Sequence, residues 1–210
     1  MARIEPFERY TGHYDRWFDV HENVYLAELR AVRPHIPEEG VGIEIGVGTG
    51  RFAVPLGIKF GLEPSPKMAE IARKRGIEVI EGVAEAIPID DEAFDFALMV
   101  TTICFLDDPM KALSEINRIL KPGGKLIIGF VDKDSPIGKF YEQHRAESKF
   151  YNVATFYSVD EVVGMMRRAG FSDFRFTQTI FEPLDRVPPD EPVKEGYGEG
   201  SFVVISGVKA

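Results

Sequence analysis

Short apolar runs alternate with amphipathic segments along most of this chain. Residues 41–45, 58–62 and 94–100 are mainly apolar or small, which is typical of strands buried on both faces of a parallel sheet. Between and after these runs, apolar residues at helical spacing predict helices over 66–75 and 109–120. The pattern therefore predicts a parallel sheet whose strands are linked by helices.

Several predicted helices carry signals for their first and last residues. Ser65 and Asp108 each stand directly before a proline, so each can cap a helix whose first residue needs no backbone donor. Ser158 followed by Glu161 forms a capping box, and Gly76 can take the left-handed conformation that ends a helix. A further helix is expected over 21–33, with Val24, Leu26, Ala27, Leu29 and Val32 as its apolar positions.

The second half of the chain contains two further strand patterns. Residues 171–181 alternate as one long strand, and 201–208 form the last one. The segment between them, 182–200, is rich in Pro, Glu, Asp and Gly and is predicted to be a mobile loop. Aromatic residues at helical spacing in 132–157 fit either a lid over a binding site or a helix packed on the sheet.

A glycine-rich turn follows the first strand. Gly46, Gly48 and Gly50 stand at alternate positions directly after residues 41–45. In such a turn a ligand can approach main-chain N–H groups that a Cβ would shield. Glu63 closes the next apolar run. Two neighbouring parallel strands would then end with a glycine loop beside a carboxylate, an arrangement suited to binding a nucleoside.

The spacing of these glycines bears on whether the ligand is a dinucleotide such as NAD or FAD. A dinucleotide fingerprint, G-x-G-x-x-G, needs its third glycine where this chain has Arg51; the glycine stands one place earlier, at Gly50. A bulky arginine at the close helix–strand approach argues against NAD or FAD. The acid Glu63 still argues for a ribose.

Five segments in order carry a resemblance to a known family. They are residues 44–50, 62–68, 82–88, 94–97 and 112–124. The chain resembles the class I S-adenosylmethionine-dependent methyltransferases, most closely the small-molecule group that includes the ubiquinone/menaquinone C-methyltransferases. This implies an α/β, Rossmann-like fold: a seven-stranded, mostly parallel sheet with helices on both faces and an antiparallel last strand between the fifth and sixth.

The resemblance also implies the cofactor, S-adenosyl-L-methionine, and the residues that hold it. These are Glu44, Gly46, Gly48, Gly50, Glu63, Pro64, Ser65, Val83, Ala84, Glu85, Thr101 and Tyr14. Val83 stands where the family usually places an acid for the adenine amino group, so adenine would rely on apolar contact and main-chain groups, with Glu85 as a substitute. Residues 51–57 leave room for a first crossover helix of only about two turns, limited further by Pro55.

The implied reaction is in-line methyl transfer to a small-molecule acceptor. A sulfonium already carries its leaving group, so geometry matters more than acid–base chemistry and no catalytic side chain is obligatory. If the acceptor must lose a proton, His13 or His144 is the candidate base. The predicted acceptor contacts are Tyr10, His13, Trp17, Phe105, Tyr141 and His144.

Composition limits the setting of this reaction. With 210 residues, one domain over 1–210 is expected, comprising an N-terminal helical cap at 1–35 and a substrate lid at 132–157. Residues 14–18 resemble the segment of the family that folds over the bound cofactor. The alternative is that the aromatic side chains of this helix only pack the N-terminus on the core. A net charge of −9 argues against nucleic acid as a substrate, and no apolar run approaches the length of a membrane span.

The single cysteine, Cys104, argues against an internal disulfide framework and a multi-thiolate metal site, so a cytoplasmic protein without a metal is expected. A monomer or homodimer is expected. Asn and Gln together number only five, a profile of proteins from hot environments, so a high melting temperature is expected.

Two other functions fit parts of the sequence. A cofactor-binding scaffold or regulator without transferase activity would keep the glycine loop. An NAD-linked oxidoreductase is disfavoured by Arg51 and by the absence of a recognisable second dehydrogenase motif.

Overall fold

The computed structural model describes residues 3–210 as an eight-stranded sheet in the order β3-β2-β1-β4-β5-β8-β6-β7. Residues 1–2 lie outside the described part. The strands are β1 (Gly42–Ile45), β2 (Phe60–Glu63), β3 (Glu78–Glu81), β4 (Phe94–Val100), β5 (Leu120–Val131), β6 (Phe171–Thr179), β7 (Lys194–Glu195) and β8 (Phe202–Lys209).

The first five strands pair in parallel, and β8 lies antiparallel between β5 and β6. The Rossmann-like arrangement predicted for the family, including the place of the last strand, is confirmed. The predicted number of strands is one too low, because β7 pairs antiparallel with β6 inside the segment expected to be only a loop. At two residues, β7 is too short to give a recognisable period-2 signal.

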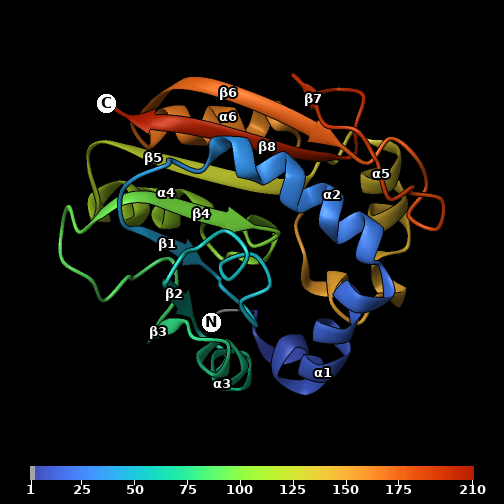
Figure 1. Cartoon of the computed structure of the whole chain (residues 1–210), viewed down its shortest axis with the longest axis horizontal. Helices are drawn as coiled ribbons and strands as arrows, with labels where there is room; N and C mark the ends of the chain where they lie inside the picture. The colour runs from blue at the N-terminus through green and yellow to red at the C-terminus, as the bar shows by residue number, and fades with distance from the viewer. Residues whose placement is uncertain (1–2) are drawn as a thin grey trace.

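Helices cover both faces of this sheet. They are α1 (Glu5–Val20), α2 (Glu22–Val32), α3 (Pro66–Lys74), α4 (Pro109–Ile119), α5 (Pro136–Gln143) and α6 (Val159–Arg168). The predicted caps are confirmed: the side chains of Ser65, Asp108 and Ser158 accept hydrogen bonds from the backbone N–H groups of Met68, Lys111 and Glu161. In Figure 1, α2 crosses one face of the sheet, while α4 and α6 lie against the other.

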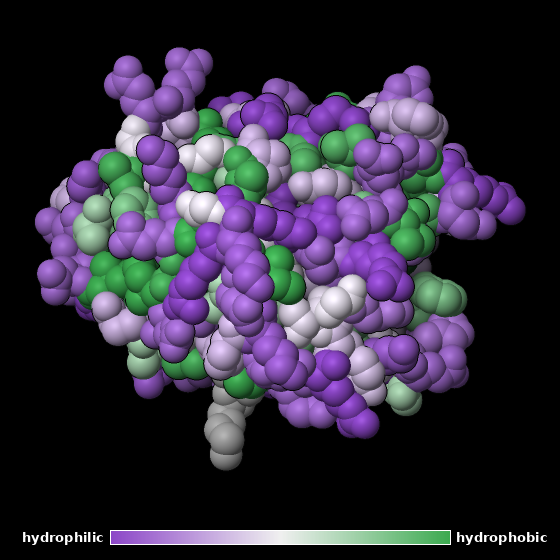
Figure 2. All heavy atoms as spheres, turned by 60° about the horizontal axis from the view of Figure 1, so that its bottom comes forward, coloured by the Kyte–Doolittle hydropathy of each residue, from purple (hydrophilic) through white to green (hydrophobic). Residues whose placement is uncertain are grey.

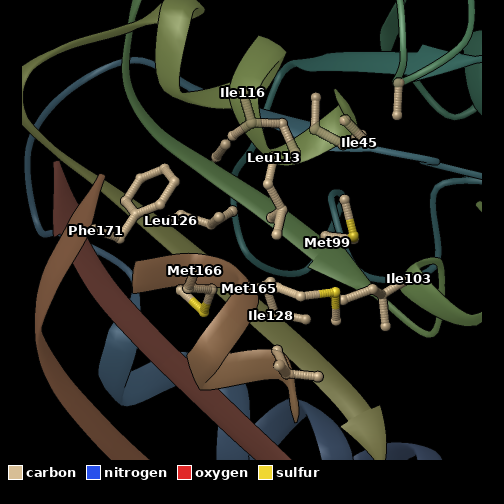
Figure 3. Packing of buried hydrophobic residues seen from close by; sticks show 14 of the residues in the cluster. Ile45, Met99, Ile103, Leu113, Ile116, Leu126, Ile128, Met165, Met166 and Phe171 are labelled. Carbon is tan, nitrogen blue, oxygen red and sulfur yellow. The ribbon is translucent and has the colours of Figure 1, made fainter. Parts of the chain in front are cut away.

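The alternation of side chains along β4 divides the core between the two faces. Ala97 and Met99 belong to the cluster under α4 and α6, whereas Phe96 and Leu98 pack with α2 on the other side. Figure 3 shows the first cluster, in which Leu113 of α4 and other side chains from both helices meet the strands. Each such buried side chain stabilises the fold by about 1.5–3 kcal/mol.

No helix forms in the short connection from β1 to β2, so the prediction of a two-turn helix there is wrong. Residues 51–57 form successive turns instead. Pro55 lacks a backbone donor, and Gly57 takes a positive φ of +75°, so helical hydrogen bonding cannot propagate. The connection still brings β2 into register with β1, with Ile45 opposite Leu62.

The buried stripe of α2 differs from the predicted one at three positions, Leu26, Glu28 and Ala31. Leu26 is 38% exposed, whereas Glu28 is only 8% exposed. Val24, Ala27 and Ala31 complete the buried face around Glu28. A carboxylate therefore stands within an apolar stripe.

Residues 182–200 form a loop, as predicted, but the loop is tied to the body of the protein. The carboxylate of Glu191 accepts a hydrogen bond from Phe181 N at 2.6 Å, and Asn23 and Arg30 of α2 donate to backbone oxygens of the loop. Val187 and Glu191 are buried. The prediction of a mobile segment missed these contacts because they join residues far apart in the sequence.

The surface is mainly hydrophilic on the face shown in Figure 2, with small hydrophobic areas among charged side chains. The large apolar side chains that are exposed lie on separate elements: Val20, Leu26, Val41, Val54, Phe140 and Tyr197. Within residues 3–210, none of the helices is long and apolar enough to cross a membrane.

Candidate active site

A cavity of about 520 Å³ lies at the carboxyl ends of the parallel strands. Its lining includes residues that follow β1, β2, β3 and β4, among them Gly46, Glu63, Val83 and Thr101. In open α/β sheets, this edge is where ligands bind. The volume falls within the range of small-molecule and cofactor sites.

The glycine loop is held against the end of β2. Gly46 N and Val47 N both donate to Leu62 O, at 2.8 and 3.0 Å. Gly46 and Gly48 take positive φ values of +72° and +55°. A Cβ on Gly46 would lie 2.6 Å from Thr102, so the close approach of the two strand ends requires glycine there.

Glu63 joins this loop to the start of α3. Its Oε2 accepts from Gly48 N at 2.8 Å and its Oε1 accepts from Ser65 N at 2.9 Å. Burial raises the pKa of Glu63 to about 7, and these two hydrogen bonds offset the effect only in part. Each carboxylate oxygen can accept a further hydrogen bond. Because Glu63 lines the cavity, those positions are available to ligand hydroxyls.

Glu44 lies behind the glycine loop and does not line the cavity. It is 2% exposed, and its Oε2 has no hydrogen-bond partner among the described residues. Burial raises the pKa of its carboxyl well above the ordinary value. A buried acceptor without a partner beside a ligand loop is the type of group that a bound polar ligand or water can satisfy.

The end of β4 supplies a strained residue to the same cavity. Thr101 has a φ of +49°, while its N–H donates to Gly129 O at 2.8 Å. Positive φ in a β-branched residue is costly and is concentrated at functional sites. The strain therefore marks this strand end as part of the site.

The turn after β3 offers mainly apolar surface to the cavity. Val83 and Ala84 line it, and Ala84 is 5% exposed. Glu85 also lines it, but its Oε1 accepts from Asp107 N at 2.9 Å, close to the start of α4. The carboxylate is thus already engaged by backbone N–H groups.

Aromatic side chains from distant segments meet over the cavity. Phe7 of α1 packs edge-on against Phe105, with ring centroids 4.9 Å apart, and lies 5.4 Å from Phe150. Tyr151 stacks on Phe105 at 6.0 Å and lies 4.6 Å from Tyr141 of α5. The N-terminal helix and residues 136–156 together enclose the cavity with aromatic side chains.

Most of the residues predicted from the sequence border this one cavity. Those that line it are His13, Tyr14, Trp17, Gly46, Gly48, Glu63, Pro64, Val83, Ala84, Glu85, Thr101, Phe105, Tyr141 and His144. Tyr10, Glu44, Gly50 and Ser65 do not. Gly50 faces α3, and Ser65 is fully buried as the helix cap.

The departure of Tyr10 has a local cause. Tyr10 has φ −120° and ψ 27°, which kinks α1 and removes its ring from the face shared by His13, Tyr14 and Trp17. The Tyr10 ring instead packs near Phe150 at 6.2 Å.

The two histidines proposed as bases lie at the exposed rim. His13 stacks on Phe150 with ring centroids 6.1 Å apart. His144 Nδ1 lies 2.9 Å from Phe140 O, and its ring is 4.3 Å from the Phe140 ring. Their assignment as bases stays a prediction.

Sequence reasoning missed Glu28 as a residue of this site. Glu28 lines the cavity from α2. A signal was present, because Glu28 stands at the i+4 position from buried Val24 and the i−4 position from buried Val32. A lone carboxylate at a core-facing helical position is unusual unless it is paired or functional.

Arg51, whose position argued against a dinucleotide, anchors α1 to the glycine loop. Arg51 and Arg75 pair with Asp15 at 2.9 and 2.7 Å, and Thr49 Oγ1 donates to the same carboxylate at 2.7 Å. Burial opposes ionisation of Asp15, but the hydrogen bonds from Arg75, Arg51 and Thr49 hold its pKa well below the usual range. The N-terminal helix is therefore fixed over the cavity by charge.

We expect Asp15→Asn to lower the free energy of unfolding by about 2 kcal/mol at neutral pH, since it leaves two partly buried guanidinium groups underpaired. Asp19→Asn is the matched control, because Asp19 pairs with Arg51 but its side chain is 63% exposed. Urea unfolding at about pH 7 and about pH 4 measures both variants. The Asp15 effect should be nearly the same at both, because it begins to shrink only below the ordinary Asp pKa of 3.8 and is lost as the pH falls to the low native pKa. Equal losses in the two variants would contradict the anchoring role.

Buried carboxyls also predict how stability depends on pH. Burial raises the pKa of Glu28 to about 8 and that of Glu63 to about 7, from 4.5. A raised native pKa means that the unfolded state ionises first, so stability falls as pH rises towards the native value. We expect a loss of about 1 kcal/mol between about pH 7 and about pH 8.5, measured by urea unfolding. A flat or rising profile would mean that both groups are ionised well below pH 7.

Comparison with known proteins identifies the family. Residues 43–128 match the family model described as a methyltransferase domain. An uncharacterised protein of Methanocaldococcus jannaschii is 51% identical over 206 residues, covering 98% of this chain and 100% of that protein. A crystal structure from Thermotoga maritima, described as an S-adenosylmethionine-dependent methyltransferase and possible histamine N-methyltransferase, is 57% identical. The match covers 99% of this chain and 100% of that one, with a TM-score of 0.97.

A more distant match shows the fold alone. It is Haemonchus contortus phosphoethanolamine N-methyltransferase 2, solved with phosphomonomethylethanolamine and S-adenosylhomocysteine, at 16% identity and a TM-score of 0.63. It spans 87% of this chain and 52% of that one. The Thermotoga relative is in keeping with the composition typical of hot environments. On the strength of the two full-length relatives and the site geometry, the chain belongs to the S-adenosylmethionine-dependent methyltransferases.

Proposed function

We propose that this protein transfers a methyl group from S-adenosylmethionine to a small-molecule acceptor. The observation that carries the proposal is the junction between the glycine loop with Glu63 and a cavity closed by aromatic side chains. The glycine loop with Glu63 suits an adenosine, and the aromatic cavity would enclose an acceptor away from water. The family supplies the cofactor class, and this geometry supports its use by this chain.

The residues at the strand ends fit this cofactor. Glu63 would accept hydrogen bonds from the ribose hydroxyls, and the small glycines would let the ligand approach the loop backbone. Val83 and Ala84 would contact the adenine ring through their apolar surface. The unsatisfied Glu44 oxygen behind the loop is a polar position that a bound ligand could reach through water.

When bound, the sulfonium supplies an activated methyl group with its leaving group attached. The task of the chain is to hold the acceptor in line and to exclude water. The aromatic residues of α1 and of the segment 132–157, which we take to be the acceptor lid, serve that purpose. A proton leaving the acceptor would pass to His13 or His144 at the rim, or to solvent.

Which atom is methylated depends on the identity of the acceptor. The ubiquinone/menaquinone group suggests carbon, whereas the description of the Thermotoga relative suggests an amine nitrogen. A panel of acceptors should therefore include phenols and quinols, histamine and other small amines. Release of S-adenosylhomocysteine is the readout for each.

Calorimetry with S-adenosylmethionine, S-adenosylhomocysteine and NAD tests the cofactor assignment before any acceptor is known. We expect both adenosyl ligands to bind and NAD not to bind. Binding of NAD alone would overturn the proposal in favour of an oxidoreductase. Tight binding of S-adenosylmethionine without turnover on the whole panel would favour a cofactor-binding scaffold or regulator.

A further inference from the structure

Glu28 is a buried carboxylate without a partner inside the cavity. It is 8% exposed and lines the cavity from the middle of α2. Across residues 3–210, no hydrogen bond or ion pair reaches its side chain, whereas the other cavity-lining carboxylate in the core, Glu63, accepts hydrogen bonds from Gly48 N and Ser65 N. Burying such a group costs free energy unless something binds it. The fold keeps it in place beside empty space, where a ligand could bind.

Three tyrosines line the same cavity as this carboxylate. Burial is the main cause that raises the pKa of Tyr14, Tyr141 and Tyr151, and the Glu28 carboxylate contributes to the rise in each. None of these hydroxyls is hydrogen-bonded to another described residue. Trp17 lines the same cavity. Glu28 thus shares its cavity with aromatic rings and unpaired hydroxyls, and such surroundings favour a cation.

The protein offers no cation of its own to Glu28 in its described part. Arg3 lines the cavity, but its guanidinium donates to Val153 O at 2.6 Å and to Thr155. Lys149 also lines the cavity, but its ammonium lies over the Tyr10 ring, 5.3 Å from the ring centre. Burial is the one cause that shifts the pKa of Glu28, so neither base acts on it. A cation that pairs with Glu28 must come from the ligand.

We propose that Glu28 binds the acceptor, and that the acceptor is a small molecule with a protonated amine attached to an apolar or aromatic body. The ammonium would pair with the Glu28 carboxylate while the body packs against the rings of Trp17 and Tyr141. This inference rests on the proposed function and names its substrate class. A neutral acceptor, such as a phenol or quinol, would leave the carboxylate unpaired.

Amine binding should release a proton. Burial raises the pKa of Glu28 to about 8, so in the free protein the group is mainly protonated at neutral pH. Pairing with an ammonium requires the ionised form, and the carboxyl proton then passes to solvent. Affinity for the amine should therefore rise as pH increases from about 6.5 to about 8 and level off above the native pKa.

The test compares an amine with a neutral molecule of the same size. Trp17 is the single tryptophan of the chain and lines the cavity, so its fluorescence reports binding. The probes are 2-phenylethylamine, histamine and the neutral 2-phenylethanol, each titrated with and without S-adenosylhomocysteine. We expect the wild-type protein to bind 2-phenylethylamine at least about tenfold more tightly than 2-phenylethanol.

Glu28→Gln should remove this preference, so that both phenylethyl probes bind with similar affinity, while affinity for S-adenosylhomocysteine stays unchanged. Glu147→Gln is the matched control, because Glu147 also lines the cavity but is exposed and should leave the preference intact. Glu28→Asp keeps the charge on a shorter side chain and should retain part of the preference, which keeps the test valid if the glutamine variant folds poorly.

The inference is overturned if wild type does not discriminate between amine and alcohol, or if Glu28→Gln binds the amine as tightly as wild type. Failure of the proposed function has a different signature: the wild-type protein would not bind S-adenosylhomocysteine, or would bind it but methylate no acceptor of the panel. The titrations without that ligand still report the amine preference in that case.

Discussion

Replacing Glu63 with alanine should weaken binding of S-adenosylmethionine at least about tenfold, because each well-made hydrogen bond to a charged group contributes about 1.5–3 kcal/mol. Glu63 is the carboxylate that both holds the glycine loop and faces the cavity. Alanine removes the acceptor of the ribose hydroxyls and releases Gly48 N. Isothermal titration with S-adenosylmethionine measures the loss.

Two variants separate binding from folding. Glu63→Gln keeps an oxygen that can accept from the loop but loses the charge, so its affinity should fall between those of wild type and alanine. Glu81→Ala is the matched control: Glu81 stands opposite Glu63 in the neighbouring strand, and its side chain is 63% exposed and pairs with Arg73. We expect this control to bind as wild type does. Loss of affinity in Glu81→Ala equal to that in Glu63→Ala would mean that the sheet edge, not the carboxylate, is needed.

The second large effect is expected at Gly48. Its φ of +55° disfavours any side chain, and a β-branched residue most of all. A Cβ would also stand 3.6 Å from the Tyr14 hydroxyl, on the surface where the ligand approaches. Gly48→Val should therefore reduce affinity for S-adenosylmethionine at least about tenfold, by a shifted loop and a filled space.

Gly57→Val is the control that carries a similar backbone cost. Gly57 has a φ of +75° and open space around it, and it does not line the cavity. Both valine variants should lose stability in urea unfolding, but only Gly48→Val should lose affinity. If Gly48→Val and Glu63→Ala both bind normally, the loop is merely a tight turn.

The short-range part of this architecture could be predicted from the sequence. Caps at Ser65, Asp108 and Ser158 follow from hydroxyl or carboxylate groups beside a helix start, and the structure has all three. The apolar run 94–100 is a strand at those same residues. These features depend on neighbours in the chain, which the sequence shows directly.

The features that were missed depend on contacts between distant segments. Residues 182–200 are tied to α2 through pairs such as Asn23 with Val187 O at 3.0 Å, and composition carries no record of such a pair. The kink at Tyr10 separates one ring from three others at regular spacing. The spacing of apolar residues along the chain indicates which side chains share a face of a helix. It does not indicate whether the helix is straight or which segment packs over it.

The same distinction applies to the site. The glycine loop and Glu63 are close in sequence to strand ends, so their meeting could be predicted, and Gly48 N does donate to Glu63. Glu28 was missed because its helix was taken as packing alone. Its position becomes meaningful only when the cavity beside it is known.

A crystal structure with S-adenosylhomocysteine bound tests the central claim most directly. We expect the ribose hydroxyls to lie within hydrogen-bonding distance of the Glu63 carboxylate. The ligand should lie against the main chain of Gly46 and Gly48, with its sulfur facing the aromatic cavity. An adenosine bound away from this loop, or a sulfur turned towards a closed wall, would contradict it.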